Sequence, residues 1–406
     1  MDAKKRYVTP VTIALAVVAL VGVGVWIYQL MGGLGVTGMN NGTSWGLYIA
    51  SFMFFVGLSA GGLIVASSAS IFNVKEYKKV ALPAVLVSTV CICMAGMFVL
   101  IDLGGIGRVY QLLLSPNFMS PLLWDVCVIT CYLVINLVYL FFMTSSKPRE
   151  KAVKRVSRFA LPIAILVHSV TAWIFGLQIA NEGWHSAIMA PLFVISAMDS
   201  GLALLLISLV ALRRAGYLKF EKSLMANLAG LLVTCIAIDG FMVGCEVLTM
   251  AYPQAEHGNA LLGQMFAGAT APFFWGEIIL GVVIPFAILV FAKNRQKTGL
   301  VMLSSALVIV GVFFKRIWLL LTSFIFPGIE GSPGLISGSS STAHATGSDV
   351  WTAISAYAPT WVEVVVVLGV VSLGALAFIV LAKTFLVGRK PEPDVVSDAA
   401  TGAQAA

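Results

Sequence analysis

Residues 45–71, WGLYIASFMFFVGLSAGGLIVASSASI, form one apolar stretch that contains no charged side chain. A helix of about 20 apolar residues is long enough to cross the hydrocarbon core of a bilayer. The glycines and serines of this stretch are typical of membrane helices that pack closely against a neighbour. The stretch therefore predicts a buried transmembrane helix.

The whole chain shares this character. Of its 406 residues, 59% are hydrophobic and 11% are charged, whereas soluble domains usually carry about 25% charged residues. The alternating pattern of a membrane β-barrel is absent. We predict an all-α integral membrane protein with ten transmembrane helices. Their expected ranges are 8–30, 45–71, 80–101, 121–143, 159–180, 187–212, 224–250, 272–292, 299–326 and 361–386.

The basic residues indicate how these helices are oriented. Of the 25 Lys and Arg residues, 22 fall at the N-terminus, in alternate loops and at the C-terminal end, all on one predicted side. Cytoplasmic loops are enriched in Lys and Arg, so both termini are predicted to be cytoplasmic. The net charge of +7 thus reflects topology, and we expect no nucleic-acid partner. Lys4, Lys5 and Arg6 resemble the start of a signal peptide, but a retained anchor helix fits the rest of the sequence better.

An internal repeat organises the predicted helices. Trp45 and Trp184 each precede a helix, with small residues 12 and 17 positions later in both. A PxxW pattern opens two further helices, at 121–125 (PLLWD) and 272–277 (PFFWGE). We expect two four-helix bundles that run in the same direction, formed by helices 2–5 and 6–9, with helices 1 and 10 flanking them. The predicted regions are 1–44 (helix 1 and an outer loop), 45–180 (first bundle), 181–326 (second bundle), 327–360 (flexible outer loop) and 361–406 (helix 10 and tail).

Ionisable residues inside membrane helices are energetically expensive, so each suggests a function. One group, at the outer mouth of the first bundle, is predicted to form a proton-coupled pocket with a deeper histidine. A second group would line the second bundle as a proton route or as an ion-pair network. Internal salt bridges that only fix helix packing are the structural alternative. The residues are Asp102, Arg108, Trp124, Asp125 and His168 in the first group, Asp199, Asp239, Glu246, Glu277, Lys315 and Arg316 in the second, and Glu363 at the start of the last helix.

Redox cofactors within the chain are not expected. A membrane haem b usually needs two axial histidines, and only His168 lies in a predicted membrane core. The six cysteines fall within helices and lack the spacing of a haem-attachment or iron–sulfur motif. We therefore predict no haem, no iron–sulfur cluster and no metal site in this chain.

Four segments together resemble the NrfD/polysulfide-reductase membrane-subunit family. They are WGLYIASFMFFVGLSAGG at 45–62, DLGGIGRVYQLLLSPNFMSPLLWD at 102–125, FFKRIWLL at 313–320 and YAPTWVE at 357–363. Ten helices are similar to the longer branch of that family, which includes the membrane subunits of menaquinone reductase, hydrogenase-2 and alternative complex III. The resemblance implies a quinone-interacting subunit without activity of its own. It would exchange electrons between the (mena)quinone pool and an extracytoplasmic ferredoxin-like four-cluster iron–sulfur partner. That partner would in turn contact a molybdopterin-type subunit, a hydrogenase or a multihaem cytochrome c.

The resemblance also places a quinone near the outer surface, where an external cluster can reach it. Residues at that end are expected to bind the quinone: Trp45, Tyr48, Arg108, Trp124 and Asp125. Asp102 and Asp125 would exchange protons with it, and His168 would relay them inward. The tryptophans fit an interfacial aromatic belt equally well. The proton path would comprise His168, Asp199, Asp239, Glu246, Glu277, Lys315 and Arg316.

Several alternatives stay open at this stage. We favour quinone reduction, with the protein in a bacterial cytoplasmic membrane and its partner on the periplasmic side. A quinol-oxidising anchor of a terminal reductase, a secondary transporter with buried carboxylates and a purely structural anchor are the competing interpretations. A transporter usually shows inverted repeats, whereas the repeat here is parallel. The loop 327–360 is read either as a solvated linker or as a flap that meets the partner.

Overall fold

The computed structural model describes residues 7–40, 42–71, 75–145, 149–325 and 357–386. Within these ranges the predicted all-helical architecture is confirmed, and ten helices are long and apolar enough to cross a membrane. Nine are continuous: α2 (Pro10–Gly32), α3 (Leu47–Ile71), α4 (Lys75–Asp102), α6 (Pro121–Thr144), α7 (Glu150–Gly176), α8 (Met189–Arg214), α9 (Lys222–Ala251), α14 (Thr298–Ile325) and α16 (Trp361–Leu386). The remaining span combines α11 (Ala271–Gly276), the π-helix η3 (Glu277–Val283) and α12 (Ile284–Leu289). Short helices fill the connections: η1 (Leu34–Val36), η2 (Ile106–Arg108), α5 (Gln111–Leu114), α10 (Glu256–Ala267) and α13 (Ala292–Arg295).

Local sequence explains where several helices begin. Thr9 and Thr12 form a reciprocal capping box at the start of α2, with Thr12 N 3.2 Å from Thr9 Oγ1 and Pro10 in the first turn. Such caps satisfy backbone N–H groups that have no partner within the helix. Proline also occupies the first turn of α6 and of α11, where its fixed φ suits helix initiation.

Three elements differ from the sequence prediction. Helix α7 begins at Glu150, nine residues before the expected start at 159, because Glu, Lys and Arg form helices readily and extend the span with a charged first portion. Helix α10 occupies a predicted loop. The eighth span contains the π-helix η3 and ends at Leu289, which the hydrophobic pattern alone does not indicate.

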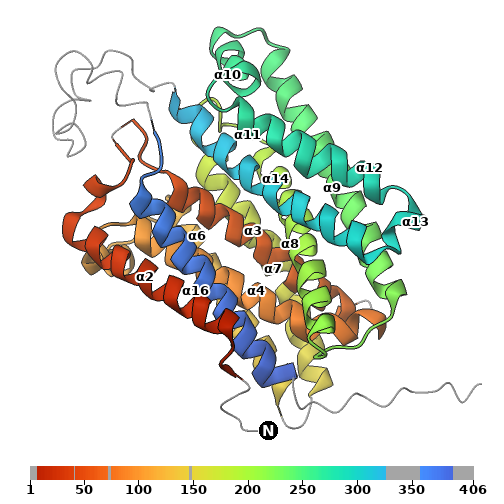
Figure 1. Ribbon diagram of the computed structural model, residues 1–406. Helices are drawn as coiled ribbons and strands as arrows, with labels where there is room; N and C mark the ends of the chain where they lie inside the picture. Colours follow the sequence, from red (N-terminus) through yellow and green to blue (C-terminus); the bar gives the residue numbers. More distant parts are fainter. Residues whose placement is uncertain (1–6, 41, 72–74, 146–148, 326–356, 387–406) are drawn as a thin grey trace, which may run out of the picture.

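Helix α3 lies at the centre of the molecule. In its apolar window 94% of the residues are buried, against 17% in α2 and in α6, so the outer helices present most of their surface to the surroundings. Helix α3 contacts α4, α7 and α8, and α6 contacts α4 and α7. On the other side, α14 contacts α8 and the η3 span, while α9 contacts α8 and α12. Figure 1 shows α9, α12 and α14 away from the side that α2 and α16 occupy.

The contact between α3 and α8 is a close backbone approach. A Cβ atom placed on Gly61 would overlap the backbone of Gly201, and one placed on Gly201 would overlap Gly61. Trp45 and Trp184, which precede these helices, stack with ring centroids 6.0 Å apart. Two contacts in the same order along both helices mean that α3 and α8 run in the same direction.

Helices α2 and α16 run side by side in the foreground of Figure 1. They meet at Gly22 and Gly369, where no side chain separates the two backbones. Lys383, near the end of α16, lies 5.8 Å from the centroid of the Tyr7 ring. The beginning of α2 and the end of α16 therefore lie at one end of the molecule. Most of the predicted loop 327–360 lies outside the described residues, which resume at Tyr357.

Candidate functional site

A buried ion network occupies the space between α9, η3 and α14. Lys315 Nζ lies 2.7 Å from Asp239 Oδ1, 2.9 Å from Asp239 Oδ2 and 3.1 Å from Glu277 Oε1. All three residues are at most 1% exposed. A single buried charge would be prohibitively costly, so a pair or a larger balanced group is required. Three of the residues predicted to line one polar group, Asp239, Glu277 and Lys315, are thus in direct contact.

Glu277 is the first residue of the π-helix, and its second carboxylate oxygen is also engaged. Trp318, one turn after Lys315 on α14, donates its Nε1–H to Glu277 Oε2 at 2.5 Å. π-Helical segments are rare and are frequent at functional sites. The combination fixes the Glu277 carboxylate between a cation and an indole donor.

Arg316 and Asp199 complete this group on the side that faces α8. Arg316 is fully buried, donates from Nη2 to Ser196 Oγ at 3.0 Å and lies 4.2 Å from the centroid of the Phe193 ring. Asp199 is 2% exposed, and its Oδ1 has no hydrogen-bond partner among the described residues. Ser196, Trp318 and Phe193 escape sequence reasoning because they carry no charge.

The charges of the network do not balance when every group is ionised. Three carboxylates, from Asp199, Asp239 and Glu277, oppose the two cations Lys315 and Arg316. One additional proton makes the buried group neutral. Because an uncompensated charge is strongly disfavoured in a low-dielectric interior, the network is suited to bind and release one proton.

Glu246 stands somewhat apart from this network. It lies seven residues after Asp239 on α9, is 6% exposed and accepts a hydrogen bond from Ser186 Oγ at 2.7 Å. Seven residues correspond to about two helical turns. Glu246 therefore lies on the same face of α9 as Asp239, nearer the loop that precedes α8.

Asp125 and Thr171 join α6 to α7. Asp125 is 4% exposed, and its Oδ1 lies 2.6 Å from Thr171 Oγ1, which is also 2.8 Å from the carbonyl oxygen of Val167. A threonine hydroxyl has one proton. Thr171 donates this proton to the Asp125 carboxyl and to the Val167 carbonyl, which share it.

His168 lies one turn earlier on α7. Its Nδ1 lies 2.5 Å from the Ala164 carbonyl oxygen and its Nε2 lies 3.0 Å from the Val56 carbonyl oxygen of α3. A neutral imidazole donates from one nitrogen only, whereas the imidazolium donates from both. His168 thus links the backbone of α7 to that of α3.

A further polar cluster joins α2, α3, α4 and α16 at the end where α3 begins. Tyr48 Oη donates to Gln29 Oε1 at 2.5 Å, and Gln29 Nε2 donates to the Ile101 carbonyl at 3.2 Å. Asp102 follows Ile101, and its Oδ1 is buried without a hydrogen-bond partner among the described residues. The cluster shows that Asp102 lies beside the flanking helices, and Gln29 was not anticipated from the sequence.

Glu363 anchors the start of α16 in this cluster. It accepts hydrogen bonds from the N–H groups of Gly38 and Thr360, both at 2.9 Å, and from Tyr357 Oη at 2.5 Å. Tyr357 Oη in turn accepts from the N–H of Leu47 at 2.7 Å. Burial and the neighbouring Glu363 carboxylate raise the pKa of the Tyr357 hydroxyl above its ordinary value, so it remains a donor.

The residues predicted to bind quinone lie towards the same end but face different partners. Trp45 joins an aromatic cluster with Trp184, Phe175 and Phe324, whereas Tyr48 points towards α2.

Arg108 is exposed, with its guanidinium against the backbone of Gly105. Trp124 donates its Nε1–H to the Phe118 carbonyl at 2.7 Å. Asp125 thus contacts α7 at Thr171, one turn from His168, and the remaining predicted ligands have separate contacts.

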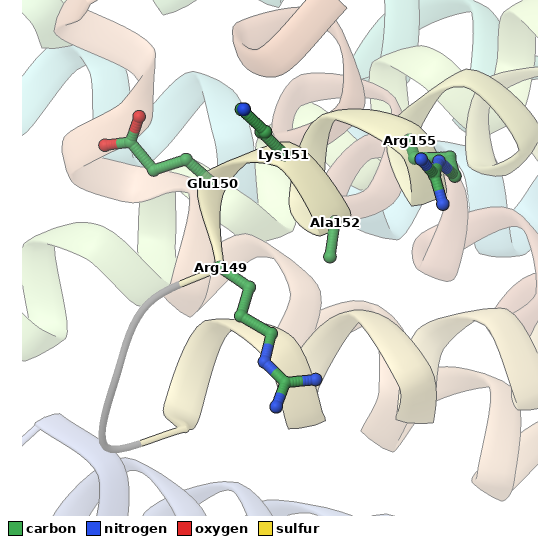
Figure 2. A pocket seen from close by; sticks show the side chains of 5 residues that line it. All are labelled: Arg149, Glu150, Lys151, Ala152 and Arg155. Atoms are coloured by element: carbon green, nitrogen blue, oxygen red, sulfur yellow. The ribbon is translucent and has the colours of Figure 1, made fainter.

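A shallow hollow of about 550 Å³ lies elsewhere, at the start of α7. Its lining residues are Arg149, Glu150, Lys151, Ala152 and Arg155. Figure 2 shows that their charged ends point in different directions. They do not converge on a ligand, so we assign no binding role to the hollow. Among the described residues, no three His, Cys, Asp or Glu side chains are grouped so as to hold a metal ion.

Comparison with known proteins places these features in a family. The model of the family described as polysulphide reductase, NrfD, matches residues 35–328, which include the helices from α3 to α14 and exclude α2 and α16. The chain belongs to the NrfD family. It is accordingly a multi-pass integral membrane protein, and the family resemblance inferred from the sequence motifs is confirmed.

Individual relatives of this NrfD-family chain extend over most of its length. A putative membrane subunit of dimethyl sulfoxide reductase from Halobacterium salinarum is 35% identical and covers 89% of this chain and 87% of its own length. The Hdr-like menaquinol oxidoreductase integral membrane subunit of Archaeoglobus fulgidus is 29% identical, over 97% of both chains. The menaquinone reductase integral membrane subunit of Nitratidesulfovibrio vulgaris is 22% identical, over 70% of this chain and 74% of its own.

Proposed function

We propose that this chain is the quinone-interacting membrane subunit of a respiratory oxidoreductase complex. Support comes from full-length similarity to a protein named as a menaquinol oxidoreductase membrane subunit and from similarity to one named as a menaquinone reductase membrane subunit. In such a complex a catalytic or electron-transferring partner outside the membrane would deliver or receive the electrons. We favour delivery, with an iron–sulfur partner on the periplasmic side and both termini of this chain in the cytoplasm.

The observation that carries the proposal is the Asp125–Thr171 pair. It is a buried carboxyl on the first unit, close to the start of α6, with a hydroxyl partner at 2.6 Å. A bound quinone supplies two-electron, two-proton chemistry. The chain must supply a proton-exchanging group in a dry site, and a buried carboxyl that is oriented by a hydroxyl donor fits that need. Asp125 would hold the proton, and Thr171 would orient the carboxyl.

The proposed chain organisation follows the repeat. We assign α3, α4, α6 and α7 to one four-helix unit and α8, α9, the η3 span and α14 to the other, with α2 and α16 flanking them. The parallel direction of α3 and α8 and the shared PxxW starts support this division. His168 and the network around Lys315 would then provide proton-accepting groups in both units.

The test is quinone turnover by the assembled complex. Asp125→Asn should lower the rate of reduction of a soluble menaquinone analogue about 100-fold, the size expected for loss of a positioned acid, while subunit assembly is unchanged. Glu256→Gln, which alters an exposed carboxyl on α10, is the matched control and should retain the wild-type rate. Quinol oxidation is measured in parallel. Full activity of Asp125→Asn in both directions would refute the assignment.

A further inference from the structure

Arg316 occupies the boundary between the two helical units. Its Nη2 reaches Ser196 on α8, and its guanidinium lies over the Phe193 ring. On the opposite side is Gly57 of α3, where a methyl group would come within 3.6 Å of the same Nη2. The absence of a side chain at Gly57 thus lets the guanidinium approach the backbone of α3.

His168 approaches α3 at the adjacent residue. Its Nε2 lies 3.0 Å from the carbonyl oxygen of Val56, which precedes Gly57 in the chain. His168 belongs to α7 and Arg316 to α14, so two basic groups from different units meet α3 at consecutive residues. Both are buried, with His168 2% exposed and Arg316 fully inaccessible.

We propose that Arg316 is a positioning residue that couples the charge on His168 in the first unit to the charge of the Asp199–Asp239–Glu277–Lys315 network in the second. A guanidinium stays charged in proteins, and like charges repel strongly where water is excluded. A proton on His168 would therefore add a positive charge beside the Arg316 guanidinium, which is unfavourable. An ionised carboxylate in the network would offset that repulsion and so favour a protonated His168. The biological use of this coupling rests on the proposed function, because it would relate proton uptake in one unit to proton release in the other.

All charged neighbours of this link can be identified from the surrounding helices. Helix α3 has no charged side chain between Leu47 and Ile71, so nothing from α3 screens His168 from Arg316. The other facing groups are Asp125 from α6 through Thr171, Asp199 from α8, Asp239 from α9, Glu277 from η3 and Lys315 from α14.

A purely structural role for Arg316 fits the geometry less well. Its Nε and Nη1 have no hydrogen-bond partner among the described residues, although a buried arginine that only fastens helices normally has most of its donors paired. At this position Arg316 holds a positive charge close to His168 on one side and to the network around Lys315 on the other. Coupling by charge and fastening by contacts predict different behaviour for Arg316→Lys and Arg316→Gln.

The test follows the titration of His168 in the full chain in lipid nanodiscs, by NMR of isotopically labelled histidine assigned with a His168→Gln variant. Arg316→Gln removes the positive charge, so the pH midpoint of the His168 signal should move upward by about one unit or more. Arg316→Lys keeps the charge and should stay close to the wild-type midpoint. Arg295→Gln, on the distant α13, is the matched control and should leave the midpoint unchanged, as should the His185 signal in every variant. An unchanged midpoint in Arg316→Gln, or equal shifts in Arg316→Lys and Arg316→Gln, would overturn the proposal.

A reciprocal measurement does not depend on the folding of Arg316 variants. The infrared carbonyl band of protonated carboxyls is titrated in the wild type and in His168→Gln. Coupling predicts different midpoints in the two proteins, and coincident titrations would overturn it. Neither measurement uses a quinone or a partner subunit. If Asp125→Asn leaves quinone turnover intact while these shifts appear, the proposed function fails and the link between the two units stands.

Discussion

The helix that begins at Pro121 and the helix that begins at Ala271 start alike and hold their carboxyl groups differently. In both, a tryptophan near the start donates its indole N–H to a carbonyl of the preceding segment, from Trp124 to Phe118 in a loop and from Trp275 to Phe266 near the end of α10. The carboxyl that follows is Asp125 in one helix, held by a hydroxyl. In the other it is Glu277, held by an ammonium and an indole. The two helices thus begin alike, but the Asp125 carboxyl has a neutral hydroxyl partner, whereas the Glu277 carboxyl has a charged ammonium partner.

The π-helix accounts for part of this difference. Asp125 follows its tryptophan directly, whereas Glu277 comes one residue later and opens the π-helical segment. A π-helix widens each turn by about one residue relative to an α-helix. Glu277 therefore starts from a different register than Asp125, and its carboxylate meets Lys315 of α14.

Removal of the central cation should have the largest effect on stability. Lys315→Met leaves Asp239 and Glu277 buried without their ion-pair partner, which should lower the free energy of unfolding by about 3–5 kcal/mol. Denaturant unfolding in detergent micelles measures this. Lys297→Met, at an exposed position just before α14, is the control and should change stability by less than about 0.5 kcal/mol. An equal loss of unfolding free energy in the two variants would show that Lys315 does not stabilise the buried carboxylates.

The close contact between α3 and α8 should be the next most sensitive feature. Gly61→Ala places a methyl group into the backbone of Gly201, so α3 and α8 must separate, at a cost of about 1–3 kcal/mol. Gly96→Ala, where a Cβ meets nothing within 4 Å, should be neutral or slightly stabilising because alanine favours helix. If Gly61→Ala were as stable as Gly96→Ala, the units would not depend on this close approach.

The sequence predicts the spans well because hydrophobicity and length are local properties. All ten spans were located, and several bounds agree within a few residues, such as 121–143 against Pro121–Thr144. The early start of α7 and the presence of α10 were missed because charged or polar residues can be helical as readily as they can form loops. The π-helix was missed because no simple periodicity marks it.

Site prediction from the sequence is more uneven. Most of the charged residues selected in apolar segments are buried, whereas Asp102 is half-buried and Arg108 is exposed. Lys315, Asp239 and Glu277 do meet. The sequence does not indicate which of them pair, because partners from α9, η3 and α14 are brought together only by packing. Neutral partners such as Gln29, Thr171 and Ser196 carry no distinguishing signal, although each satisfies or orients a buried polar group.

The two tryptophan-led helices also allow the repeat itself to be tested with a small, matched effect. Trp124→Phe and Trp275→Phe each remove one indole donor and leave the carbonyl of Phe118 or Phe266 without that bond, at a cost of about 1 kcal/mol each. Equal losses, measured by the same unfolding assay, are expected if the tryptophans perform the same task in both units. Trp361→Phe, at a position that is 62% exposed, controls for the general effect of a smaller aromatic ring. A loss of stability confined to Trp275→Phe would mean that only the helix that carries Glu277 depends on its tryptophan. The two helix starts would then be alike in sequence but not in the role of the tryptophan.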